Sequence, residues 1–134
     1  MRRVRPEQME AFREARREEL AERLAARAAR LYPEKVAERR NEEVRAEARR
    51  ISASARSWGL TSERDVTIYY DLSLELGPHF EKGDDGAWAR EILEDRARGP
   101  HERIVAVRDA YFWAEVEDPF AEDGAGSRPA GRGR

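Results

Sequence analysis

The fold is decided by the stretch Arg56-Ser57-Trp58-Gly59-Leu60-Thr61-Ser62-Glu63-Arg64-Asp65-Val66, within which one helix is expected to end and another to begin. Gly59 stands where the end of a helix favours a residue with a left-handed backbone. Ser62, or Thr61 before it, offers a hydroxyl to the first free amides of the next helix. Asp65 follows Ser62 at the spacing of a capping box. The stretch therefore predicts a tight junction between two helices.

Helical periodicity continues on both sides of this junction and predicts an all-α bundle of about five helices. The first helix is expected from Pro6 to Leu31, where Tyr32-Pro33 ends it because the residue before a proline disfavours helix. A short turn over 33–40 follows, with Asn41 as the cap of a second long helix that ends at Ser57. Three further helices are expected over 62–76, 87–97 and 100–117, separated by Gly77-Pro78, an acidic loop and Gly99-Pro100.

The length of 134 residues is enough for one modest hydrophobic core. We expect a single helical domain over residues 1–117. Residues 118–134 are rich in Gly, Pro and Arg, and such a composition buries too little apolar surface to pay for ordering, so a disordered tail is expected there. No alternation of apolar and polar residues is long enough to predict a strand.

Charge is distributed unevenly along the chain, although the formal net charge is only −2. Residues 1–50 contain 15 Lys/Arg and 11 Asp/Glu, whereas residues 51–123 contain 8 and 17. Halves of opposite sign attract each other within one molecule or between molecules. A nucleic-acid-binding protein more often has an overall basic excess, so the composition argues against that class.

Cysteine is absent, which excludes disulfides, thiolate nucleophiles and zinc sites that need cysteine ligands. No apolar run approaches the roughly 18 residues of a membrane span. Arg2, Arg3 and Arg5 are not followed by the apolar stretch of a Sec-type signal peptide. Nearly all basic residues are arginine, which is typical of a GC-rich bacterial genome. We therefore expect a cytoplasmic bacterial protein that does not enter membranes.

Neither catalysis nor metal binding has a recognisable motif in the chain. The acidic loop 81–86 lacks the alternating ligands of an EF-hand and is interpreted as a solvated turn whose Asp85 caps the following helix. His79 and His101 are the only histidines, and neither belongs to a metal-binding pair. We expect no catalytic residue, metal or cofactor; a hydrolase would need a pocket with convergent polar groups around one of the two histidines.

The first helix is dense in arginine, and arginine binds phosphate groups. Its glutamates are interleaved at helical spacing, however, which favours ion pairs along a solvated face. The alternative function that remains open is a small helical regulator or nucleic-acid-associated protein that uses this helix. The arginines concerned are Arg13, Arg16, Arg17, Arg23, Arg27 and Arg30.

Nine of the eleven aromatic residues lie in or after the junction, so contact chemistry is concentrated in the second half of the chain. Three consecutive aromatics, Tyr111-Phe112-Trp113, point about 100° apart on a helix and therefore cannot all face one core. Exposed aromatics are typical anchors of protein interfaces. Some of the candidates must form the core instead, and the sequence leaves open which ones. The candidate partner-binding residues are Tyr69, Tyr70, Trp88, Tyr111, Phe112 and Trp113, together with Trp58.

Several segments resemble a family of small helical bacterial proteins whose genes lie beside those for type VI secretion spike and effector proteins. The resemblance is greatest in Gly59-Leu60-Thr61-Ser62-Glu63-Arg64-Asp65-Val66, and it includes Glu7-Gln8-Met9-Glu10-Ala11-Phe12 and Leu31-Tyr32-Pro33-Glu34. It continues in Tyr70-Asp71-Leu72, Leu76-Gly77-Pro78-His79-Phe80 and Trp88-Ala89-Arg90-Glu91-Ile92-Leu93. The family is expected to have a Gly near Asn41, which this chain lacks, and the resemblance does not extend to the aromatic helix from Pro100.

This resemblance implies an accessory or adaptor role without a catalytic residue. The leading interpretation is a non-enzymatic, all-helical adaptor that binds a protein partner. The expected partner is an effector or spike component of a type VI or related contractile secretion system. Binding through an aromatic anchor and binding through phosphate contacts differ in salt dependence, because phosphate contacts weaken steeply with salt.

Overall fold

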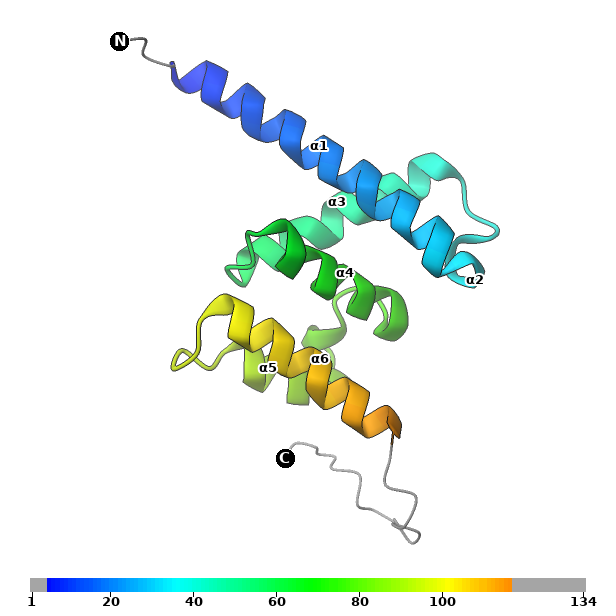
Figure 1. Ribbon diagram of the computed structural model, residues 1–134, viewed down its shortest axis with the longest axis vertical. Coiled ribbons are helices and arrows are strands. Elements are labelled where there is room, and N and C mark those ends of the chain that lie inside the picture. The colour runs from blue at the N-terminus through cyan, green and yellow to red at the C-terminus, as the bar shows by residue number, and fades with distance from the viewer. Residues whose placement is uncertain (1–4, 117–134) are drawn as a thin grey trace, which may run out of the picture. The chain divides into compact units, whose positions relative to one another are not determined.

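The computed structural model describes residues 5–116, and within them the chain is all-α, as the sequence predicts (Figure 1). Six α-helices and two short 3-10 turns occur in this part of the chain, against the five helices expected, because Pro33–Val36 forms a helical turn of its own. The chain divides into two compact units, which we call unit 1 (residues 1–53) and unit 2 (residues 54–134). The single domain expected over residues 1–117 stays a prediction, and the expected tail over 118–134 lies outside the described residues.

Unit 1 contains the long helix α1 (Pro6–Leu31), the turn α2 (Pro33–Val36) and most of α3 (Asn41–Ser57). Pro6 occupies the first turn of α1, where its missing N–H costs nothing, and the Gln8 side chain accepts a hydrogen bond from the Arg5 amide at 3.0 Å. Asn41 is the first residue of α3 rather than the cap before it. The buried apolar residues of unit 1 are Ala21, Leu24, Ala28, Val44, Ala48 and Ile51.

The junction that follows α3 has the geometry that its sequence predicts. Gly59 has a φ of 87°, and its amide donates to the carbonyl of Arg56 at 2.9 Å. Ser62 caps the next helix, since its hydroxyl accepts a hydrogen bond from the Asp65 amide at 3.1 Å. Leu60 between them is fully buried. Local capping chemistry and burial of one leucine together fix the turn.

Unit 2 is formed by the end of α3, by α4 (Glu63–Leu76), by α5 (Ala87–Leu93) and by α6 (Pro100–Val116). Helix α6 packs against both α4 and α5, and Figure 1 shows α5 and α6 side by side. Arg103 of α6 is buried and donates to the carbonyl of Leu93 at 2.6 Å, which ties the end of α5 to α6. All three tryptophans of the chain, Trp58, Trp88 and Trp113, belong to unit 2.

Helix α5 ends at Leu93, four residues before the expected end at Ala97. The Asp95 side chain accepts a hydrogen bond from the Ala97 amide at 3.0 Å. An aspartate that bonds the backbone two residues ahead stabilises a turn in competition with the helix. The periodicity of the sequence did not reveal this competition.

Two 3-10 turns, η1 (Phe80–Lys82) and η2 (Asp84–Gly86), lie between α4 and α5. The expectation that Asp85 caps α5 is wrong, because Gly86 is the residue before the helix and no side chain caps it. The backbone approaches itself closely at this point. A Cβ atom on Gly86 would lie 1.6 Å from the carbonyl oxygen of Phe80, so only glycine fits without movement of the backbone.

Candidate protein-docking surface

Two of the aromatic residues proposed as partner contacts lie in the core of unit 2. The side chains of Tyr69 and Tyr70 are 0% and 1% exposed. The Tyr69 ring lies 5.4 Å from the ring of Phe80, between centroids. These tyrosines are therefore packing residues in this fold, and we leave them out of the docking surface described below.

Tyr69 belongs to a buried polar cluster around Glu81, which is 0% exposed. The Tyr69 hydroxyl donates to the Glu81 carboxylate at 2.9 Å, and the indole N–H of Trp58 donates to the same carboxylate at 2.8 Å. Burial first, and then the nearby charge of Glu81, raise the pKa of the Tyr69 hydroxyl far above its usual value. The expectation that loop 81–86 is fully solvated is therefore wrong at Glu81.

Trp58 is half-buried, and its indole N–H donates to the buried Glu81. Trp88 and Tyr111 are also half-buried. The Tyr111 hydroxyl lies 3.3 Å from Oε1 of Glu75, to which it donates. These rings have mixed surroundings, and the structure places them between the core and the surface.

Phe112 and Trp113 are the two candidates that lie at the surface, with 60% and 69% of their surface exposed. Their ring centroids are 6.3 Å apart and their planes are nearly perpendicular, an arrangement that stabilises aromatic pairs. Asp109 precedes them by three and four residues and therefore lies on the same side of α6. We call Asp109, Phe112 and Trp113 the α6 patch.

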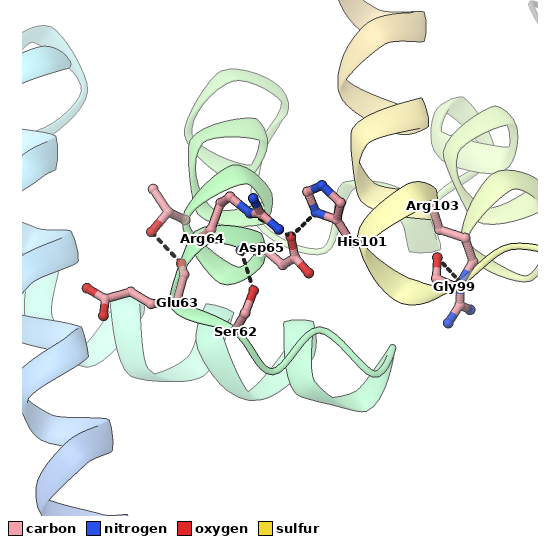
Figure 2. Close-up of polar contacts among 8 residues, drawn as sticks. Ser62, Glu63, Arg64, Asp65, Gly99, His101 and Arg103 are labelled. Atoms are coloured by element: carbon pink, nitrogen blue, oxygen red, sulfur yellow. Dashed lines mark hydrogen bonds and ion pairs between the residues drawn. The ribbon is translucent and has the colours of Figure 1, made fainter.

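A second polar contact joins the start of α4 to the start of α6 (Figure 2). The imidazole Nδ1 of His101 lies 2.5 Å from Oδ1 of Asp65, whose side chain is almost fully buried. Ser62, the helix cap, bonds the backbone amide of Asp65. The pair joins two helices.

His79 is exposed and has a φ of 60°, which is unusual for a residue other than glycine. Its Nδ1 lies 3.3 Å from the hydroxyl of Ser54. Within residues 5–116, no carboxylate is hydrogen-bonded or ion-paired to this imidazole, as a nucleophile–base–acid arrangement requires. Among the same residues, no three His, Asp or Glu side chains are placed to hold a metal ion together.

Two arginines of α1, Arg13 and Arg17, form ion pairs with glutamates of the same helix. Arg17 lies 3.2 Å from Glu14 and 3.7 Å from Glu10, and Arg13 lies 4.0 Å from Glu10. All these side chains are at least one-third exposed. Pairs of this kind neutralise the helix surface locally, which weakens its attraction for phosphate.

Unit 1 contains a groove with a volume of about 300 Å³. Its apolar lining consists of Ala25, Ala26 and Ala29 of α1, Val36 of α2 and Val44 of α3. Small side chains on α1 leave the space that larger residues would fill. The sequence reasoning missed this groove; the Ala25-Ala26 and Ala28-Ala29 pairs are the signal that could have indicated it.

Glu81 is the other residue that the sequence reasoning missed. The polar edges of Trp58 and Tyr69 need acceptors when their rings are buried, and this requirement is the signal that could have indicated a buried carboxylate.

No protein-family model, curated protein or solved structure matches this chain. Within the part of the chain that the structure describes, no helix is both long enough and apolar enough to cross a membrane.

Proposed function

We propose that this protein is a non-enzymatic accessory or adaptor protein that binds a protein partner through the α6 patch. The observation that supports the proposal is the exposure of two adjacent rings, Phe112 and Trp113, on a helix that is itself packed against α4 and α5. Rigid aromatic side chains on a well-packed element lose little conformational entropy on binding, and such residues dominate the energy of interfaces.

The partner that we propose is an effector or spike component of a type VI or related contractile secretion system. Its class comes from the resemblance of the segments around Gly59–Val66 to proteins encoded beside such genes. Its surface chemistry comes from the charge of unit 2, since residues 54–116 contain 8 Lys/Arg and 13 Asp/Glu. A basic surface with an apolar pocket for the two rings would complement this unit.

The test is a calorimetric titration of the purified chain with the effector and spike proteins encoded with it in the source bacterium. Phe112→Ser combined with Trp113→Ser removes both rings and is expected to weaken binding at least about 30-fold, the effect of losing one strong interface anchor. Phe12→Ser is the matched control, because Phe12 is 63% exposed but lies on α1 in unit 1. Unchanged affinity in the double variant, or no binding to any of these proteins, would contradict the proposal.

The dependence of affinity on salt concentration distinguishes the proposal from the alternative, a nucleic-acid-associated protein. Binding through the α6 patch should weaken only severalfold between about 50 and 200 mM salt, because its main contacts are two rings, whereas several phosphate contacts would lower affinity by orders of magnitude over that range. Tight, salt-sensitive binding of a DNA or RNA oligonucleotide that Arg13→Ala and Arg16→Ala abolish would favour the alternative.

A further inference from the structure

We propose that the groove of unit 1 is the binding site for the α6 patch of a second copy of this chain, so that the protein self-associates weakly and reversibly. The inference goes beyond partner binding and does not depend on it. It rests on two surfaces, each described within its own unit: a groove that combines small apolar residues with charged and polar ones, and a pair of exposed rings.

The size of the groove suits the two rings of the α6 patch. The groove of about 300 Å³ is at the lower limit of small-molecule pockets, which suits a ring or two rather than a large ligand. The apolar part of its lining consists of alanine and valine, which are too small to fill the groove themselves. Phe112 and Trp113 are the most exposed large apolar residues of the described part of unit 2 and already pack edge to face.

The charges match as well. Residues 5–53 of unit 1 have a formal net charge of +2, whereas residues 54–116 of unit 2 have −5. The charged residues that line the groove are Glu22, Arg39 and Arg45. Arg39 already forms an ion pair with Glu47 at 2.6 Å. The half-exposed Arg45 is therefore the cation suited to bind a carboxylate from another copy.

Asp109 is the carboxylate that the α6 patch brings to this groove. It forms an ion pair with the neighbouring Arg108, whose Nε lies 3.6 Å from Oδ1 of Asp109. Both side chains are more than half exposed, so this pair is weak and exchanges easily for another.

The expected affinity follows from the area available. Two aromatic side chains bury roughly 300–500 Å² together, below the roughly 600 Å² that each partner buries at the lower limit of a stable interface. Self-association should therefore be weak, with a dissociation constant on the order of 100 µM rather than nanomolar. Binding of a partner protein at the same rings would dissociate the copies.

The first experiment is sedimentation equilibrium of the full chain from about 10 µM to 1 mM. The mean mass should rise above the 15.5 kDa of one chain with concentration. Ala29→Trp fills the groove and should abolish the rise, whereas Ala15→Trp, an exposed alanine of α1 that does not line the groove, should not. A mass of one chain at every concentration would overturn the inference.

The second experiment reverses the charges of Asp109 and Arg45 to test whether these two surfaces bind each other. Asp109→Arg alone and Arg45→Asp alone each place like charges opposite one another and should weaken association at least about fivefold. An equimolar mixture of these two variants restores opposite charges and should recover association. Failure of the mixture to recover, with both variants helical by circular dichroism, would overturn the inference.

The groove variants also separate this inference from the proposed function. Ala29→Trp and Arg45→Asp alter unit 1 alone, so they should leave partner binding through the α6 patch unchanged while they abolish self-association. Substitution of Phe112 and Trp113 should reduce both. Partner binding that depends on the groove variants would contradict the assignment of the groove to a second copy.

Discussion

Unit 1 closes its core with small side chains, whereas unit 2 closes its core around aromatic rings and a buried carboxylate. Three of the six buried apolar residues of unit 1 are alanines: Ala21, Ala28 and Ala48. Unit 2 buries Tyr69, Tyr70 and Phe80, and it satisfies the tyrosine and tryptophan polar groups at Glu81. Packing of small residues has little directionality, while hydrogen bonds to one carboxylate have strict geometry. We therefore expect unit 2 to be much more sensitive to single substitutions than unit 1.

The largest expected effect is that of Gly86→Ala in unit 2. The added Cβ would lie 1.6 Å from the carbonyl oxygen of Phe80, so the backbone of η1 or η2 must move. We expect a loss of more than about 4 kcal/mol in the free energy of unfolding, or no folded unit 2. Gly99→Ala is the control, since a Cβ there meets no atom within 4 Å, and it should stay within about 1 kcal/mol of the parent in a urea titration.

Removal of the buried carboxylate should have the next largest effect. Glu81→Ala leaves the Trp58 indole and the Tyr69 hydroxyl without their acceptor and opens a cavity, at a cost of about 3 kcal/mol. Glu81→Gln keeps one carbonyl acceptor and nearly the same volume, so it should cost less than Glu81→Ala. Equal stability of both variants and the parent in urea would show that the cluster contributes nothing to unit 2.

The same cluster predicts a dependence on alkaline pH. The folded-state pKa of Tyr69 is raised by burial and by Glu81, so its contribution to stability is complete below the unfolded pKa of about 10. Above that pH the unfolded chain loses the proton first. The free energy of unfolding should then fall by about 1.4 kcal/mol per pH unit from this group alone.

Tyr69→Phe isolates this contribution, because phenylalanine has no proton to lose. The difference in stability between the parent and Tyr69→Phe should shrink as the pH rises above about 10. Tyr111→Phe is the control, since Tyr111 is half-buried and bonds Glu75 near the surface. A constant difference between the parent and Tyr69→Phe across this range would contradict the assignment.

The sequence predicts those features of the fold that are determined by residues close together in the chain. Proline at the start of α1, Ser62 before α4 and Gly59 after α3 act within a few residues, and the helix bounds near them were correct. The burial of Glu81 depends on Trp58, 23 residues earlier in the chain, and on Tyr69, 12 residues earlier. Such pairings are set by tertiary packing, which periodicity does not contain.

The candidate surface shows the same limit. The sequence predicts that Tyr111, Phe112 and Trp113 cannot all be buried, and two of the three are exposed. It does not predict that Tyr69 and Tyr70 are more deeply buried than Phe112 and Trp113. The local sequence does not show whether a ring lies on the inner face of α4 or on the outer face of α6. The groove of unit 1 depends on how α1 and α3 approach each other, which no local signal fixes.

The smallest expected effect lies in unit 1. Arg17→Ala removes ion pairs with Glu10 and Glu14, all with exposed side chains, and should cost less than about 0.5 kcal/mol. The effect should decrease further with added salt, because exposed pairs are screened. A loss above about 2 kcal/mol would show that unit 1 relies on specific polar contacts, as unit 2 does, and would remove the contrast between them.

The confinement of Trp58, Trp88 and Trp113 to unit 2 gives the molecule a built-in spectroscopic label. Indole fluorescence follows the unfolding of unit 2 alone, whereas far-ultraviolet circular dichroism follows the helices of both units. Fluorotryptophan incorporated throughout the chain would add three ¹⁹F resonances, one for a ring bonded to a buried carboxylate, one for a half-buried ring and one for a ring 69% exposed. Binding at the α6 patch, melting of unit 2 and loss of the Glu81 cluster are thus separable in one sample without an added dye.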